Sequence, residues 1–81
     1  MDQVQNYNPN IFDVAAFIRR ARETTRLTQE EFTRQLDTSE PVALRINRVT
    51  LSKYENGVIV PPADKFLKIM HVARRIGAAS V

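Results

Sequence analysis

The chain has 81 residues, a formal net charge of +3 and no cysteine. This length predicts a single domain, which we place at residues 1–81 with residues 1–8 as a flexible arm. The absence of cysteine excludes disulfides and thiolate metal sites within this sequence. No apolar run approaches the roughly 18 residues that a membrane span requires. The first eight residues also lack the basic and apolar segments of a signal peptide. We therefore expect a cytoplasmic protein without membrane contact.

The positive charge is unevenly distributed. Residues 1–18 carry only Asp2 and Asp13, and basic side chains begin at Arg19. Arginine outnumbers lysine nine to three. The planar guanidinium suits phosphate and guanine better than an ammonium does, so the balance favours a nucleic-acid partner. A solvated helix surface explains the same charges equally well.

Apolar spacing and capping residues predict four helices. The first is expected at Pro9–Thr24, with Asn8 or Asn10 as the N-cap. The second begins at the capping box Thr28-Gln29-Glu30-Glu31, with a hydrophobic staple from Leu27 to Phe32, and continues to about Leu36.

The third helix is expected at Arg48–Glu55, because Asn47 is a strong N-cap and Ile46 and Leu51 occupy the staple positions. Gly57 suits the left-handed residue after a helix end. The link through Pro61-Pro62 is expected to be extended, with an edge strand as the alternative. The fourth helix is expected at Ala63–Ile76, ended by Gly77.

Three motifs fall inside these helices, and together they resemble one family. The short third helix carries polar side chains that could read bases in a major groove. The chain resembles the Cro/C1-type (XRE-like) helix-turn-helix DNA-binding family over roughly residues 15–73. The resemblance implies an all-α, compact, four- to five-helix domain of the lambda-repressor type. Its motifs are Ile18-Arg19-Arg20-Ala21-Arg22-Glu23, Leu27-Thr28-Gln29-Glu30-Glu31-Phe32 and Val49-Thr50-Leu51-Ser52-Lys53-Tyr54-Glu55-Asn56-Gly57.

The expected DNA contacts follow from helix geometry and from the resemblance. Gln29 could donate to a phosphate beside the free amides of its helix. Arg48 could bind guanine through two hydrogen bonds, and Val49 could pack on a thymine methyl. The resemblance implies a backbone contact by Asn56, with Leu51 and Tyr54 facing the core. The full set of expected DNA-binding residues is Thr28, Gln29, Arg45, Asn47, Arg48, Val49, Thr50, Ser52, Lys53 and Asn56.

The chain departs from the family pattern at two places. Arg26 stands where the family usually has the glycine that ends its first helix. The tight turn between helices two and three is enlarged by about eight residues, within Asp37–Ile46. We expect either a long loop or a single helical turn after Pro41, with the third helix starting at Asn47, which we favour, or a longer helix that Ser39 caps and that runs through to Asn56. Arg45 is the insert residue best placed to reach a phosphate.

The resemblance implies a homodimeric repressor of the phage or plasmid kind that binds a double-stranded DNA operator. The alternatives are an antitoxin or a restriction-modification controller with the same motif, or a protein-interaction module that has lost DNA binding. We expect no catalytic residues, no metal or other cofactor and no small-molecule substrate, and we interpret His71 as structural. The family's fifth helix is missing, so apolar residues are expected to remain for a partner subunit, among Phe12, Phe17, Met70, Ile76 and Val81.

Overall fold

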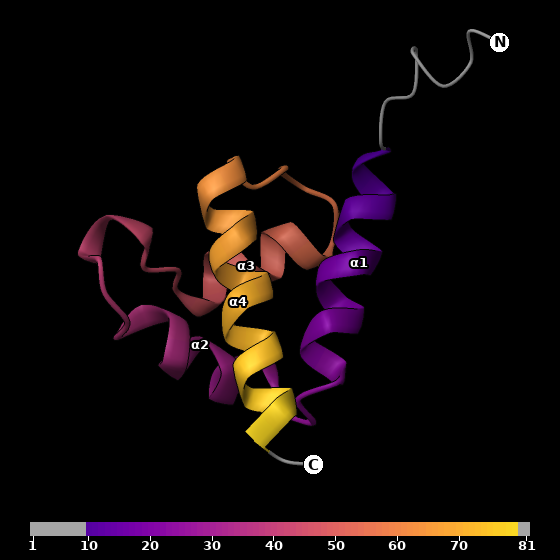
Figure 1. Ribbon diagram of the computed structural model, residues 1–81. Helices are drawn as coiled ribbons and strands as arrows, with labels where there is room; N and C mark the ends of the chain where they lie inside the picture. The colour runs from indigo at the N-terminus through magenta and orange to yellow at the C-terminus, as the bar shows by residue number, and fades with distance from the viewer. Residues whose placement is uncertain (1–9, 80–81) are drawn as a thin grey trace, which may run out of the picture.

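The computed structural model describes residues 10–79, and every regular element there is helical (Figure 1). The predicted all-α class is confirmed. The expected arm at residues 1–8 and the apolar residue Val81 lie outside the described residues. The elements are α1 (Ile11–Glu23), α2 (Gln29–Asp37), the 3-10 turn η1 (Val42–Leu44), α3 (Arg48–Glu55) and α4 (Ala63–Ala79).

The predicted caps begin three of the helices. The Asn10 side chain accepts the Phe12 N–H, so α1 begins at Ile11 rather than at Pro9. Both hydrogen bonds of the Thr28 capping box are present at the start of α2. The Asn47 side chain accepts the Thr50 N–H at 2.8 Å and so caps α3. Each cap satisfies an amide that the helix itself leaves unpaired.

The end of α3 has the geometry that glycine allows. Gly57 has a φ of 72°, and the Val58 N–H donates to the Lys53 carbonyl at 2.9 Å. This pairing across a left-handed residue is the Schellman motif. A Cβ on Gly57 would lie 2.8 Å from a ring carbon of Phe12, so a side chain here would also require the Phe12 ring to move. From Val58 to Pro62 the link is irregular and forms no strand.

The turn between α1 and α2 contains a strained residue. Arg26 has a φ of 63° although it is not glycine. The hydroxyl of the buried Thr25 donates to the Arg22 carbonyl and accepts the Leu27 N–H, which holds the turn on both sides of Arg26. Arginine therefore occupies the left-handed conformation that the family's glycine adopts without steric cost.

The predicted end of α4 at Ile76 is wrong, because the helix continues to Ala79. Gly77 does not have a positive φ and lies within the helix near Thr24. The alanines that follow it favour helix. The last turn of α4 therefore packs beside the end of α1 instead of turning away.

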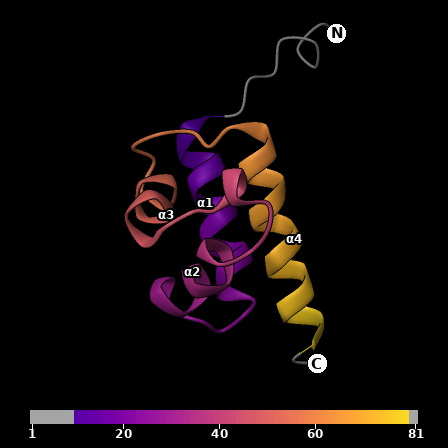
Figure 2. The ribbon, with the colours of Figure 1, turned by 90° about the vertical axis from the view of Figure 1, so that its left-hand side faces the viewer.

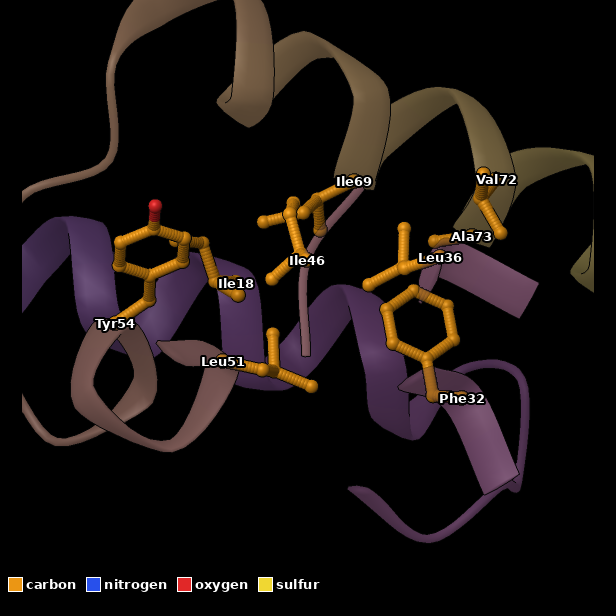
Figure 3. Packing of buried hydrophobic residues seen from close by; sticks show 9 residues of the cluster. All are labelled: Ile18, Phe32, Leu36, Ile46, Leu51, Tyr54, Ile69, Val72 and Ala73. Atoms are coloured by element: carbon orange, nitrogen blue, oxygen red, sulfur yellow. The ribbon is translucent and has the colours of Figure 1, made fainter. Parts of the chain in front are cut away.

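The core forms where the helices cross. α1 packs against α3 and α4, α2 packs against the same two helices, and Figure 2 shows α3 and α4 on opposite sides of α1. Figure 3 shows the enclosed side chains pointing toward one another from all four helices and from the segment before α3. They are Ile18, Phe32, Leu36, Ile46, Leu51, Tyr54, Ile69, Val72 and Ala73.

The apolar residues that were expected to remain for a partner divide into two groups. Met70 and Ile76 are partly buried and pack against the core. Phe12 and Phe17 are exposed on α1. Among the described residues of this set, the side chains that stay exposed therefore belong to α1.

Replacing Arg26 with glycine is expected to stabilise the fold by about 1 kcal/mol, because glycine adopts a positive φ without a steric cost. Arg20→Gly is the matched control, since it removes the same side chain from an exposed site inside α1. The control is expected to destabilise by roughly 1 kcal/mol. Urea unfolding followed by circular dichroism measures both, and a loss of stability in Arg26→Gly would contradict the assignment.

Candidate nucleic-acid interface

One face of α3 is exposed along the whole helix. Successive residues turn by about 100°, which places the buried Leu51, Tyr54 and Glu55 on one side. Val49 and Lys53 lie on the opposite side and are exposed, and the Val49 side chain is 62% exposed. The prediction that Leu51 and Tyr54 face the core is confirmed. The side chains available on α3 are therefore those that were expected to read DNA.

Two basic side chains of α3 are free of internal partners. Arg48 and Lys53 are exposed, and neither side chain makes a hydrogen bond or ion pair within the described residues. Arg48 follows the N-cap directly, and Lys53 lies in the last turn. A guanidinium at the first helical position keeps all five N–H donors for a ligand.

The polar residues of α3 partly serve the helix itself. The oxygen of the Asn47 side chain is used by the cap, which leaves its NH2 group as a donor. The side-chain nitrogen Nδ2 of Asn56 donates to the Ser52 carbonyl at 2.8 Å and lies 3.2 Å from the Ser52 hydroxyl. Ser52 and Thr50 are half-buried. These side chains thus border the exposed face, Val49 and Lys53 project from it, and Arg48 is exposed at the first position of the helix.

A buried carboxylate joins α3 to α1. Glu55 is 1% exposed, and Arg22 from α1 donates to both of its oxygens, from Nε at 2.7 Å and from Nη2 at 3.0 Å. The remaining Nη1 of Arg22 donates to the Leu27 carbonyl at 2.9 Å. Arg19 donates to the backbone carbonyl of Glu55. Two parallel hydrogen bonds between guanidinium and carboxylate fix distance and orientation together.

The electrostatics of the Arg22–Glu55 pair follow from these bonds. The hydrogen bonds with Glu55 raise the pKa of Arg22 above its usual value, against the opposing effect of its own desolvation. The guanidinium is therefore charged at every pH at which the protein is folded. A buried charge pair is tolerated when its geometry is good and its donors and acceptors are hydrogen-bonded. The Glu55 carboxylate meets this condition, because a charged guanidinium binds both of its oxygens.

The same carboxylate also holds the N-terminus of α2. The Gln29 side-chain nitrogen donates to Glu55 Oε1 at 3.0 Å. Gln29, expected to be a free phosphate donor, therefore has one of its two amide hydrogens engaged inside the protein. The backbone amides of Gln29 and Glu30, at the first positions of α2, lack acceptors within the helix. Because Glu55 is the last residue of α3, the start of α2 and the end of α3 are kept in fixed relation.

Nothing in the sequence pattern singled out Glu55. A charged residue in the last turn of an amphipathic helix is usually solvated, and its partners lie 26 and 33 positions away in the chain. One signal was available, because Glu55 follows Leu51 by four positions and therefore shares its buried side. That position is compatible with burial of the side chain, but it does not indicate which residue pairs with the carboxylate.

The insert between α2 and α3 is a loop with one helical turn, as favoured from the sequence. α2 ends at Asp37, and the Thr38 and Ser39 hydroxyls donate to the Arg34 and Leu36 carbonyls. The alternative of a long helix capped by Ser39 is therefore wrong. Pro41 adds a reason, because it disfavours helical backbone at the residue before it.

Arg45 holds this loop together. Its Nε donates to the Ser39 carbonyl at 2.9 Å, and its Nη2 lies 2.9 Å from a Glu40 carboxylate oxygen. The Lys68 ammonium donates to the Glu40 carbonyl at 2.7 Å, which ties the loop to α4. Ile46 then enters the core, where it is 1% exposed. The insert is therefore anchored at both ends rather than hanging free beside α3.

Two other kinds of site find no support in the described part of the chain. Residues 10–79 hold no group of three or more histidine, aspartate or glutamate side chains that could bind a metal ion. None of the described helices combines the length and the apolarity of a transmembrane helix.

The arrangement matches a known family. A family model described as a helix-turn-helix domain covers residues 15–72, from the middle of α1 to the buried part of α4. The chain belongs to the helix-turn-helix family of the Cro/C1 type. Searches of curated proteins and of solved structures gave no match. In this family α2 and α3 are the two helices of the motif, and α3 is the recognition helix.

Replacing Glu55 with alanine is expected to lower the free energy of unfolding by about 3–5 kcal/mol, because Arg22 would lose its buried counter-ion. Glu23→Ala is the control, since that carboxylate is exposed on α1 and its loss should cost less than about 0.5 kcal/mol. Urea unfolding compares the two, and a cost below about 1 kcal/mol for Glu55→Ala would show that the buried pair contributes little.

Stability is also expected to fall in alkaline solution because of Tyr54. Burial of the phenol, and then the Asp64 carboxylate, raise the pKa of Tyr54 above 10.0. The unfolded chain ionises near pH 10 while the folded one stays neutral, so this contribution is present below pH 10 and lost above it. The free energy of unfolding, measured at about pH 9 and about pH 11, should fall less in Tyr54→Phe than in the wild type. An equal fall in the two proteins would refute this role of Tyr54.

Proposed function

We propose that this protein is a sequence-specific DNA-binding transcriptional regulator that acts as a repressor. The observation that carries the proposal is the exposed surface of α3, with Arg48 at its first position and Val49 and Lys53 on its outer face, in a helix-turn-helix family member. Such a helix enters the major groove with its N-terminal residues at the base edges.

The side chains on this face fit two kinds of DNA contact. Arg48 is assigned to guanine, through two hydrogen bonds to O6 and N7, and Val49 to a thymine methyl. Asn47, Thr50 and Ser52 border these positions and are assigned to polar contacts with neighbouring bases or the backbone. These contacts supply sequence discrimination, because base edges differ in the major groove.

The phosphate contacts come from the surrounding elements. The start of α2 offers the free amides of Gln29 and Glu30 and the Thr28 hydroxyl, and helix N-termini favour anions. Lys53 and Asn56 are assigned to the backbone at the far end of α3. Arg45 uses two of its five N–H donors inside the loop, which leaves three for a phosphate.

Operator binding by a homodimer follows from the same geometry. A short recognition helix reads few base pairs, and two helices related by a two-fold axis read two half-sites one helical turn apart. A protein bound in this way at a promoter blocks transcription by occupying it. The operator is therefore expected to be a palindrome, which can be recovered by selecting bound sequences from a random DNA pool.

Replacing Arg48 with alanine is expected to cost about 1–3 kcal/mol on the selected operator and to relax preference at one base pair. Arg74→Ala is the control, since it removes the same charge from an exposed site on α4. Fluorescence anisotropy gives both affinities, on operator and on random DNA.

Two results would refute the assignments. If Arg48→Ala weakens operator and random DNA equally, the arginine contacts phosphate and not guanine. If the wild-type protein selects no sequence, and its affinity does not fall steeply between about 50 and 200 mM salt, the protein is not a DNA-binding regulator.

A further inference from the structure

A continuous apolar surface lies on the side of the molecule where the first turns of α1, the link from α3 to α4 and the first turns of α4 meet. Figure 1 shows this link running from beside α1 to the start of α4. We call its exposed large side chains the apolar face. They are Phe12, Phe17, Val58, Ile59, Val60 and Leu67.

Contacts connect the members of the apolar face to one another. The Phe12 ring lies against Gly57, next to Val58. The Phe17 ring stacks on the Phe66 ring, with centroids 5.9 Å apart. Val60 and Leu67 line a common hollow with Val14, Phe66, Pro61 and Ala63. The exposed side chains thus form one patch rather than scattered single residues.

The patch contains both a hollow and a projection. The hollow has a volume of about 400 Å³ and walls that are almost entirely apolar. Leu67 stands at its edge with 65% of its surface exposed. A two-fold interface requires a surface that is complementary to itself. A patch that carries an apolar hollow and an apolar projection side by side meets this requirement.

The charge around the patch disfavours DNA as its occupant. The segment from Asn56 to Ala63 contains no charged residue, and residues 11–18 contain only Asp13. The first turns of α4 carry Asp64, Lys65 and Lys68, and the Lys68 ammonium is engaged by the Glu40 carbonyl. DNA binding depends on cations that displace the counter-ions of the phosphates, and the six side chains of the apolar face supply none.

The size of the apolar face matches the need of a dimer. Six side chains, each about half exposed or more, present on the order of 600 Å² of apolar surface. A stable interface buries about 800 Å² on each partner, of which about 65% is apolar in homodimers. The apolar face therefore supplies the apolar part of one standard interface.

We propose that the apolar face is the surface through which two copies of this chain form a two-fold symmetric dimer. The inference deepens the proposed function, because such a dimer brings two α3 helices to one operator, and its relevance to DNA rests on that proposal. The dimer itself depends only on the apolar face and forms without DNA.

The test is the mass of the protein in solution without DNA, measured by sedimentation equilibrium from about 1 µM to about 1 mM. The wild-type chain is expected to reach twice its 9.3 kDa. Leu67→Glu and Val58→Glu place a charge in the interface and should weaken self-association about tenfold or more. Both side chains are exposed, at 65% and 62%, so the substitutions leave the core intact.

Val42→Glu is the matched control. Val42 is 61% exposed, but it lies in η1, in the insert and away from the apolar face. Circular dichroism checks that each variant is folded. A wild-type chain that stays monomeric at about 1 mM would overturn the inference. So would a dimer that Leu67→Glu and Val58→Glu leave unchanged, or one that Val42→Glu weakens as much.

Binding to a single half-site separates this inference from the proposed function. Leu67→Glu leaves the exposed face of α3 untouched, so its half-site affinity should equal that of the wild type. If the wild type is monomeric but binds the half-site, the dimer surface is wrong and the regulator stands. If the wild type dimerises through the apolar face but binds no DNA, the proposed function is wrong and the dimer surface stands.

Discussion

The carboxylate of Glu55 is buried at the junction of three helices, and the position of α3 depends on it. Arg22 from α1 donates to both oxygens, Gln29 from α2 donates to one of them, and Arg19 donates to the backbone carbonyl of the same residue. An apolar core alone would let a helix of eight residues rotate or slide with little change in buried area. Directional, charge-assisted hydrogen bonds remove this freedom. The start of α2 and the end of α3 are therefore held as one unit, and α3 as a whole is fixed beside α2.

The enlarged turn between α2 and α3 is compatible with this unit because its ends are anchored. Arg45 and Lys68 bind the loop carbonyls, and Ile46 inserts into the core just before α3 begins. The length of a surface loop affects stability only weakly once its ends are fixed. α2 and α3 thus pack against each other although the connection between them is longer than the family pattern.

The charged and apolar surfaces of the domain are separate. Basic and polar side chains gather on α3 and at the start of α2, whereas Phe12, Val58 and Leu67 belong to an uncharged patch on α1, the link and α4. This separation allows both surfaces to be occupied at once. A chain of this size buries only about 60% of the surface that it exposes when unfolded. An apolar patch that becomes covered by a second copy would add stability that the single domain lacks.

The sequence by itself determined the four helices, the starts of α2, α3 and α4, and the outer face of α3. Capping residues such as Thr28 and Asn47 act on amides two or three positions away, and apolar spacing reflects the turn of a single helix, so both are readable locally. The end of α4 was misread because Gly77 can either end a helix or continue it, and packing beside Thr24 decides between the two. Only the tertiary structure decided the role of Glu55, the engagement of Gln29 and Arg45, and which apolar residues stay exposed. Those outcomes depend on partners far away in the chain, and the geometry that joins them exists only after α1, α2 and α3 have packed.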